Sequence, residues 1–491
     1  MLIVLAGVLL VCLAFQPLAF VGLGCFLALL AAAALRPVCT LNLLVATLPL
    51  QAVLVLTFRA NIKSSELLGC VLVLAVAARC LAWREPIVIE RSIALPIFLF
   101  LLLTLISTLN TPRFRESMIL NQYMDVGVGR DSPDTRSYLT AAWAVYCVFL
   151  LFSVTSILRR LPDLFQTLRV LFWTNAAAAV FGVFQWVYLL RNGSLLQLPG
   201  STYHADVVHS TSQGFPRSPG TFTEPSVFAN YLVLMLPVTL AIATGSFPQV
   251  AKRRTAWLVL SLEVLALLLS FSVSGYVQFV IGLCLFGYLA SLRQSKESAV
   301  WAVTRRALAG AVGILVVVSV LQFVGVYPAD VGEFVAQRLL GEADSAQQRF
   351  GLARIAWQMA QDHAVTGVGI GNYPFLAMSY AAEHSVALRQ FILPTPSNLF
   401  VLFAAELGLP GMLAFGWLML RVGRALKRGL DRAPAEVRLL HVGLCTAMAS
   451  TFLSFLFLDN LFVNYFWVLL GLSLALVKVA SQPGHQDAVH P

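Results

Sequence analysis

Two charged side chains lie in a polar stretch that runs directly into an apolar segment. Residues 214–231 read GFPRSPGTFTEPSVFANY and contain one arginine, Arg217, and one carboxylate, Glu224. Charges beside a membrane span usually serve a ligand or a partner charge. A guanidinium suits an oxyanion because its donors form a planar fork, and a carboxylate can accept a proton. Pro225 suits the first turn of a helix, so we expect Glu224 beside that helix's start and Arg217 just outside it.

Both charges also have simpler interpretations. Arg217 could extend to the membrane–water interface or form a structural pair with Glu224. Glu224 could stabilise the start of the following helix, where acidic side chains are favoured in any case. The sequence leaves these alternatives open.

The composition predicts an all-α polytopic integral membrane protein. Of its 491 residues 59% are hydrophobic and 11% charged, with a mean hydropathy of +0.83, which indicates transmembrane helices. In such a protein a net charge of +10 belongs to cytoplasmic loops, so we expect no nucleic-acid binding. The eight cysteines fall in or beside apolar segments, so we expect neither disulfides nor a metal site, and no cofactor.

We expect 12–14 transmembrane helices, the first kept as a membrane anchor because a basic signal-peptide start is missing. The predicted spans are 2–15, 18–35, 38–57, 65–83, 92–109, 137–158, 166–190, 225–245, 256–273, 275–292, 306–326, 398–422, 439–458 and 461–480. This divides the chain into helices with the Arg217 loop (1–326), a large outer loop (327–397), C-terminal helices (398–480) and a disordered tail (481–491).

The basic residues predict the orientation. They fall on alternate loops, such as those around Arg84, Arg159 and Arg424, and these loops should face the cytoplasm together with both termini. The three longest loops, 110–136, 191–224 and 327–397, then face outward.

The loop 327–397 is too long to lack structure of its own. Residues 344–363, DSAQQRFGLARIAWQMAQDH, predict a helix that projects Arg349 and Arg354. Its expected apolar side consists of Phe350, Ile355, Ala356 and Met359. The following TGVGIGNYP predicts a tight turn and not a dinucleotide site, because no strand precedes it.

Three segments together resemble the O-antigen ligase and O-antigen polymerase superfamily. The first, RSPGTFTEPSVFANYL (217–232), is similar to that family's Arg-x-x-Gly-x-Phe segment before a span. The second, QRFGLARIAWQMAQDHAVTGVGIGNY (348–373), resembles its outer-loop pattern of an arginine, a helix and a Gly-x-Gly-Asn turn, with Ala364 where proline is usual. The third, PSNLFVLFAAELGLPGML (396–413), is similar to its His-Asn segment followed by Glu-Leu-Gly.

The resemblance implies a multi-span, GT-C-like glycosyltransferase at the outer face of the bacterial inner membrane. Its implied partners are an undecaprenyl-pyrophosphate-linked glycan, the lipid bilayer, and a chain-length regulator and flippase of the same pathway. Family ligases carry a functional histidine where this chain has Ser397, and an arginine where it has SFSVSGYVQF (270–279). These departures favour a polymerase of repeat units. A ligase acting on lipid A core or protein, and a glycolipid transporter or flippase, are the alternatives.

For that reaction the resemblance assigns catalysis to Arg217, Glu224 and Arg349. The arginines would stabilise the departing diphosphate without a metal, and Glu224 would accept the proton of the acceptor hydroxyl. The expected substrate-binding residues are Arg354, Ser397, Asn398, His363 and His384. Alternatively, Ser397 and Asn398 cap the span that begins at Leu399, Arg354 contacts lipid headgroups, His363 is a satisfied loop histidine, and Glu406 serves helix packing.

Overall fold

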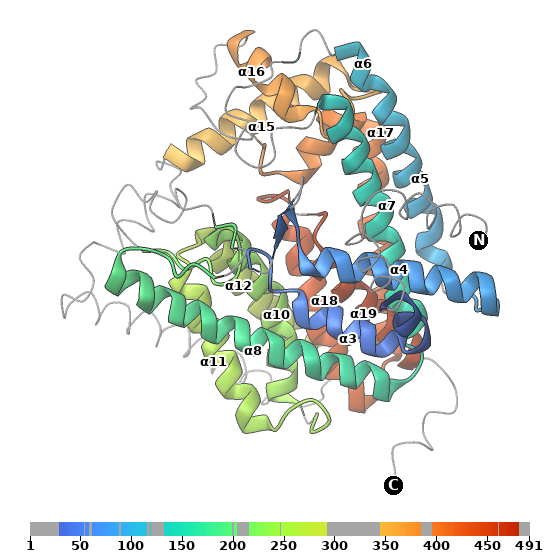
Figure 1. Ribbon diagram of the computed structural model, residues 1–491, viewed down its shortest axis with the longest axis vertical. Helices are drawn as coiled ribbons and strands as arrows, with labels where there is room; N and C mark the ends of the chain where they lie inside the picture. The colour runs from blue at the N-terminus through green and yellow to red at the C-terminus, as the bar shows by residue number, and fades with distance from the viewer. Residues whose placement is uncertain are drawn as a thin grey trace, which may run out of the picture.

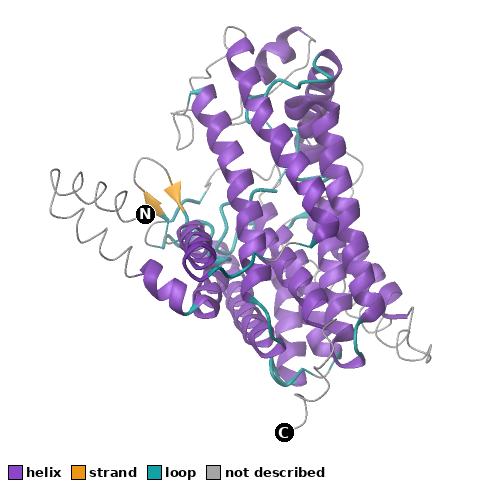
Figure 2. Ribbon diagram, turned by 90° about the vertical axis from the view of Figure 1, so that its right-hand side faces the viewer, coloured by secondary structure: helices purple, strands orange, loops and turns teal. Residues whose placement is uncertain are grey.

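The structure is a computed structural model that describes residues 29–53, 55–57, 61–87, 90–114, 118, 132–198, 201–203, 216–245, 247–291, 344–383, 395–459 and 461–480. It confirms an all-α membrane architecture, in which most helices run along the long axis of the molecule (Figures 1 and 2). The helices are α3 (Pro37–Thr47), α4 (Ser64–Trp83), α5 (Arg91–Ser107), the short 3-10 helix η1 (Thr108–Asn110), α6 (Thr111–Phe114), α7 (Pro133–Ile157), α8 (Leu161–Asn192), α10 (Pro225–Thr244), α11 (Arg253–Leu269), α12 (Val273–Ser291), α15 (Asp344–Asp362), α16 (Tyr373–Glu383), α17 (Leu399–Arg432), α18 (Ala435–Ser454) and α19 (Asn464–Ala480).

Eight helices in the described part of the chain are long and apolar enough to cross a membrane. They become nine when the pair Leu29–Leu35 and Pro37–Thr47, bent by 116°, counts as one span. The predicted spans 2–15 and 306–326 and most of 18–35 lie outside the described residues. The total of 12–14 therefore stays a prediction.

The span predicted at 38–57 is wrong beyond residue 47. Helix α3 ends at Thr47 because Pro49 has no N–H for the next helical hydrogen bond. The chain then forms a two-residue antiparallel pair, β1 (Leu56–Thr57) and β2 (Asn61–Ile62). Before it, the N–H of Ala52 donates to the carbonyl of Thr221 at 2.8 Å. An expected membrane span thus serves as a support for the loop that contains Arg217.

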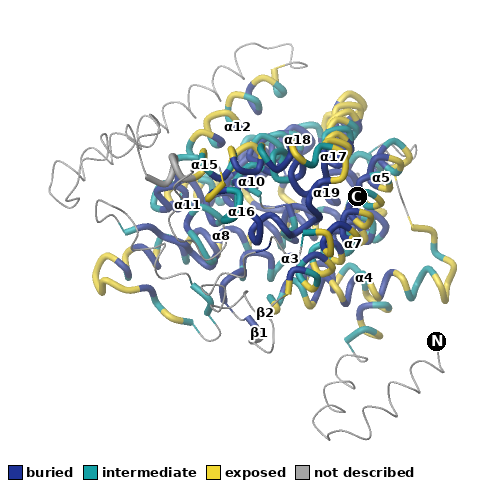
Figure 3. Tube along the Cα trace, turned by 90° about the horizontal axis from the view of Figure 1, so that it is seen from above, coloured by how far each residue is buried: buried dark blue, intermediate teal, exposed yellow. Residues whose placement is uncertain are grey.

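Helix α10 lies at the centre of the bundle. Its sequence is apolar on all sides, which is typical of a fully buried helix. Inside the molecule 89% of its best spanning window is buried, against 28% for α12 at the periphery. Figure 3 shows α10, α18 and α19 as the dark core, with exposed positions along α4 and α12. The start of α10, where Glu224 lies, is therefore held by helices on several sides.

A buried carboxyl joins α11 to two of its neighbours. Glu263 of α11 is fully buried and accepts hydrogen bonds from the amide of Asn175 on α8 and from the hydroxyl of Thr239 on α10, the latter at 2.7 Å. Buried polar groups need such partners because burial removes their water. These bonds fix α11, whose C-terminal end contributes to the candidate site.

The predicted cytoplasmic loops meet one another at one end of the bundle. Arg421 of α17 donates to the carbonyl of Ser92 at 2.8 Å, and Arg428 lies 3.6 Å from Glu90. Glu85, after α4, pairs with Arg159, after α7. These contacts hold the three loops to one another, and their cytoplasmic location stays a prediction. Helices α15 and α16 lie together at the top of Figure 1.

Main-chain hydrogen bonds join the Gly-rich turn after α15 to a break in α17. The break is at Gly408 (φ 71°, ψ 177°), and Leu409 N donates to Ala364 O at 2.7 Å. Val368 N and Gly369 N donate to the carbonyls of Ala405 and Glu406, each at 2.9 Å. The turn predicted from TGVGIGNYP is confirmed, and its function here is to attach α15 and α16 to α17.

Only glycine fits at the two points of closest approach. A Cβ atom on Gly408 would lie 2.7 Å from the carbonyl oxygen of Val365, and one on Gly367 would lie 2.3 Å from that of Glu406. Both residues also have positive φ, which disfavours side chains. The other side of the turn is held by Asn110, whose Nδ2 donates to Thr366 O at 2.9 Å.

We expect Gly408→Ala to destabilise the protein by about 1–3 kcal/mol, since it strains the backbone and crowds the Val365 carbonyl. Gly416→Ala, eight residues further along α17, is the control, because a Cβ there meets nothing within 4 Å. It should instead stabilise the helix by about 0.5–1 kcal/mol. Thermal unfolding of the two purified variants measures the contrast. Equal midpoints would contradict the docking described above.

Candidate functional site

The loop that contains Arg217 and Glu224 is fixed by hydrogen bonds from three directions. Trp186 of α8 donates to the carbonyl of Pro216 at 3.1 Å, and Ser218 donates to the carbonyl of Gly182 on the same helix at 2.7 Å. On its other side Thr221 donates to the carbonyl of Pro49 at 2.6 Å. The loop is thus part of the packed structure, as irregular backbone at membrane depth must be.

Arg217 lies inside this packing, with 7% of its surface exposed. Its Nε donates to the carbonyl of Ser270, the residue that follows α11, at 3.2 Å. A cation is favoured there because the C-terminal carbonyls of a helix carry partial negative charge. Arg217 therefore has a structural contact with α11, whereas the catalytic role predicted for it stays a prediction.

Glu224 occupies the position directly before α10, as expected. Its backbone is extended, and its side chain makes no capping bond to the helix. Oε2 instead accepts a hydrogen bond from the hydroxyl of Ser226 at 3.2 Å, and the residue is half-buried. The carboxylate thus remains available to groups outside α10.

The helix predicted at 344–363 is confirmed as α15, with one error on its apolar side. Ile355, Ala356 and Met359 are buried in a cluster with residues of α16 and α17, such as Ala405. Phe350 is 72% exposed and does not belong to this side. The buried side also contains Leu352, and position 350 lies about 200° around the helix from it.

The charges of two carboxylates from distant parts of the chain, Glu224 and Asp459, act on Arg349 of α15. We call these three residues the charge cluster. Burial lowers the pKa of Arg349, and the negative charges of Glu224 and Asp459 oppose that shift. By surface area, however, the whole residue is exposed. The side chain of Arg349 is therefore surrounded by protein on one side and accessible to water on the other.

Asp459 lies between α18 and α19 and completes the charge cluster. Burial raises the pKa of its carboxyl, as does the charge of Glu224, whereas the hydroxyl of Thr395 and the charge of Arg349 lower it. The residue still has partial access to water. Asp459 is thus a surrounded but accessible carboxyl beside an arginine.

Packing contacts bring the three loops of this region together independently of charge. The ring of Phe222, two residues before Glu224, lies 5.0 Å from Tyr231 and 6.4 Å from Tyr465 at the start of α19. Tyr231 and Tyr465 are 5.4 Å apart. Leu399 N, at the start of α17, donates to Phe455 O at the end of α18 at 2.8 Å. These contacts fix the segments that carry Glu224, Thr395 and Asp459.

Two of the predicted substrate-binding residues have structural roles. The side chain of Asn398 accepts the N–H of Val401 at 3.1 Å and caps α17, as the alternative interpretation proposed. His363 contacts the hydroxyl of Tyr380 through Nε2 at 3.2 Å and packs edge-on against Phe114 at 4.7 Å.

The other predicted residues are less constrained. Arg354 is exposed on α15, and Ser397 has a positive φ of 48° beside the Asn398 cap. His384 lies outside the described residues. The substrate contacts predicted for these residues stay predictions.

Glu406 serves packing, as its alternative interpretation proposed. Its Oε1 accepts the N–H of Tyr373 at the start of α16 at 3.1 Å. Arg136 of α7, whose charge acts on Glu406, also lies 5.9 Å from the centre of the Phe375 ring. These contacts hold α16 between α7 and α17.

The charge cluster contains the kinds of group that a transfer reaction needs when its leaving group is an anion. One guanidinium can bind oxyanions, and two carboxylates can accept or return a proton. In the part of the chain that the structure describes, no three His, Cys, Asp or Glu side chains form a group that could hold a metal ion.

A protein-family model described as O-antigen ligase matches residues 256–416. The match supports the O-antigen ligase and polymerase superfamily, whose members are membrane glycosyltransferase-like enzymes, and it leaves ligase and polymerase unseparated. The spanning helices make the chain a multi-pass membrane protein. No curated protein matches it.

The matched range covers α11 to the middle of α17. It contains Arg349 and the second and third resembling segments, and the first segment and Asp459 lie outside it. In the sequence Asp459 lies just before the span predicted at 461–480, with no partner evident nearby. Such a position was a usable signal, because charges at spans normally have partners. Its partner Arg349 is 110 residues away and only the folded chain reveals the pair.

Proposed function

We propose that the protein transfers a glycan from a lipid diphosphate to a sugar hydroxyl and so polymerises oligosaccharide repeat units. The observation that carries this proposal is that the charges of Glu224 and Asp459 act on Arg349, in a chain whose residues 256–416 match a family model described as O-antigen ligase. The substrate would be an undecaprenyl-pyrophosphate-linked oligosaccharide, destined for O-antigen, capsule or exopolysaccharide. A chain-length regulator and a flippase are the proposed partners.

Arg349 would bind the departing diphosphate. The acceptor oxygen attacks the anomeric carbon, the bond from that carbon to the diphosphate oxygen breaks, and the diphosphate leaves with the electron pair. Negative charge grows on the leaving group, and a guanidinium already in place stabilises it without reorganisation. This step requires no metal. Arg217, in the loop on the other side of Glu224, would support the same anion.

One carboxyl of the pair would take the proton of the acceptor hydroxyl. In the free protein the charge of Arg349 lowers the pKa of Asp459. A diphosphate that binds Arg349 would reduce this effect and make the carboxylate a stronger base. Donor binding would thereby activate the base. When no donor is bound the carboxylate would be a weaker base, so it would activate water poorly.

We place this chemistry at the outer, periplasmic face of the bacterial inner membrane, with both termini in the cytoplasm. The basic loops gather at one end of the bundle, and α15 belongs to the long loop that the charge pattern assigns to the other side. Undecaprenyl-linked glycans would reach the charge cluster from the adjoining bilayer.

The second candidate is an O-antigen ligase that transfers the glycan to lipid A core or to protein. The description of the matching family favours it. Ser397 in place of the histidine of family ligases favours the polymerase. Donor, leaving group and the role of Arg349 are the same in both reactions.

Arg349→Ala should lower the rate of glycan transfer by roughly 10²–10³-fold, by analogy with the loss of one oxyanion donor. Arg253→Ala is the control, since it removes the same side chain from an exposed position at the start of α11. It should retain activity within a few-fold. High-molecular-weight polysaccharide on gels, at equal protein level, measures both. If the Arg349→Ala variant makes normal polymer, Arg349 does not belong to the catalytic site.

Deletion of the protein separates the two candidate reactions. A polymerase deletion should leave single repeat units on undecaprenyl pyrophosphate, because no units are joined. A ligase deletion should accumulate long undecaprenyl-linked polymer that never reaches its acceptor. Gel analysis of the lipid-linked fraction distinguishes them, and long lipid-linked chains would contradict the polymerase.

The pH profile identifies the base. The raised pKa of Asp459 means that it stays protonated above the range of a free aspartate, about 3.9, so activity should fall as the pH drops through that raised value. Glu224→Gln removes a charge that raises this pKa, so the acid limb should move to lower pH if Asp459 is the base. A complete loss of activity would instead assign the base to Glu224. An unmoved limb in an active variant would exclude Asp459.

A further inference from the structure

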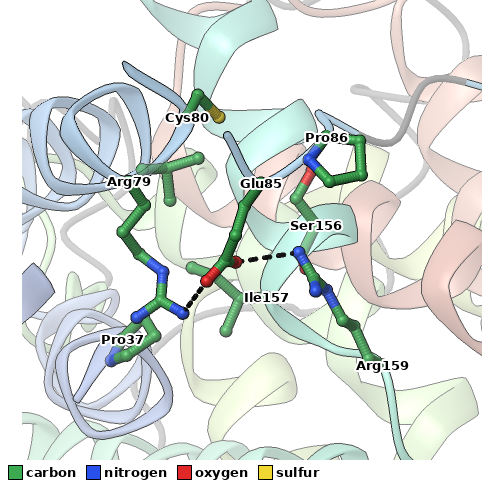
Figure 4. A pocket seen from close by; sticks show the side chains of 9 residues that line it. Pro37, Arg79, Cys80, Glu85, Pro86, Ser156, Ile157 and Arg159 are labelled. Carbon is green, nitrogen blue, oxygen red and sulfur yellow. Dashed lines mark hydrogen bonds and ion pairs between the residues drawn. The ribbon is translucent and has the colours of Figure 1, made fainter. Parts of the chain in front are cut away.

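A small cavity lies where the start of α3 meets the last turns of α4 and α7. None of the charge-cluster residues lines it. Its volume is about 110 Å³, and two arginines and one glutamate line it: Arg79, Arg159 and Glu85. Apolar groups, including Pro37 and Ile157, form the remaining wall. Figure 4 shows Arg79 and Arg159 pointing at Glu85 from opposite sides.

The charged groups are held in place by their own hydrogen bonds. Arg79 donates to the carbonyl of Ala34 at 2.6 Å and pairs with Oε1 of Glu85. Arg159 donates through Nε to the carbonyl of Ser156 at 2.9 Å and pairs with Oε2 of Glu85 at 3.0 Å. Two guanidinium groups thus converge on one carboxylate, which is the arrangement that a phosphate group would also satisfy.

The basic residues at the cavity carry more positive charge than Glu85 neutralises. Lys478, in the last turn of α19, interacts electrostatically with Arg159. Arg79, Arg159 and Lys478 give three positive charges against the one negative charge of Glu85, which leaves a net charge of +2. Arg79 and Glu85 are only partly exposed, so water screens their charges incompletely, whereas Arg159 is exposed.

The cavity is at the depth of lipid headgroups. Arg79 lies in the last turns of the spanning helix α4, and Arg159 lies two residues after the spanning helix α7. The guanidinium of Arg79 lies 4.8 Å from the ring centre of Trp83, which is half-exposed. Tryptophan at the end of a span is typical of the membrane–water interface.

The volume of the cavity limits the size of the ligand that it can bind. A site for one water needs only about 10–15 Å³ on the same measure, so the cavity can admit water and a group of the size of a phosphate. Sites for larger small molecules measure roughly 300–1,000 Å³. The cavity is thus too small for a nucleotide or a glycan, while its apolar wall suits the carbon atoms attached to a phosphodiester.

We propose that this cavity binds the phosphate of an anionic membrane lipid, with Arg79 and Arg159 as its ligands and Glu85 as the internal anion that the phosphate displaces. Basic pockets between spanning helices bind anionic headgroups in this way on the cytoplasmic side, the side that the basic loops assign to Arg84 and Arg159. The proposal is independent of the transfer reaction, because it uses none of the charge-cluster residues.

The test measures binding of phosphatidylglycerol to the purified full-length protein by titration in phosphatidylcholine nanodiscs. Arg79→Gln and Arg159→Gln should each weaken binding about fivefold, the effect expected of one interfacial arginine. Arg160→Gln is the control, because it removes the same charge from the adjacent, exposed residue outside the cavity. It should change the affinity less than twofold.

Glu85→Gln should change the lipid affinity in the opposite direction. It removes the internal anion and should tighten lipid binding about fivefold, whereas a purely structural ion pair would lose stability and gain no affinity. Inorganic phosphate replaces the lipid in a parallel titration. Binding of phosphate but not lipid, with the same dependence on Arg79, would assign the site to a free anion. Equal losses from Arg79→Gln and Arg160→Gln, or weaker binding by Glu85→Gln, would overturn the proposal.

Discussion

The main-chain bonds between the Gly-rich turn and the broken helix α17 determine where the outer part of the protein lies. Leu409 and Ala364 are joined by one of them, and Val368 and Gly369 contribute two more. Each is worth only about 1 kcal/mol in net terms, but their geometry is strict because glycine alone fits at Gly408. Since α15 leads directly into this turn, the junction also sets the position of Arg349 relative to Glu224.

The two arginines singled out by the sequence have different environments. Arg217 is buried and donates to the carbonyl of Ser270, directly after α11, so it helps to fix the loop before α10. Arg349 is accessible and has carboxylates as neighbours. An arginine satisfied by carbonyls gives rigidity, whereas one whose partners are carboxylates can exchange them for another anion. This difference makes Arg349 the stronger candidate for the diphosphate.

Periodicity and hydropathy predicted the helices well wherever a helix depends mainly on its own local sequence. The spans around α4, α5, α7, α8 and α10, the helix α15 and the tight turn after it follow from local patterns. The error at 38–57 arose because hydropathy alone does not register that Pro49 ends the helix within an apolar stretch. The error at Phe350 came from assigning one side of a helix from too few apolar positions, without Leu352.

The charge cluster could be predicted only in part. Arg349 and Glu224 were identified because each is a charged residue in a resembling segment. Asp459 joins them only because α18 and α19 bring their connecting loop to the start of α10, through contacts such as Phe222 with Tyr465. A single sequence gives no information on such long-range pairing. The roles of Asn398 and Glu406 as supports were, by contrast, readable from helix-capping and burial arguments.

The Glu263 contact has a consequence for biogenesis. Helix α11 has only 17 residues and carries a carboxyl, so its entry into the bilayer alone is costly; a charge at mid-bilayer costs about 2.5–3.5 kcal/mol on insertion scales. Both groups that hydrogen-bond this carboxyl, Asn175 and Thr239, precede it in the chain. During synthesis they enter the membrane first and can receive α11 as it leaves the ribosome. The order of the segments along the polypeptide thus matches the order in which the bundle can be assembled.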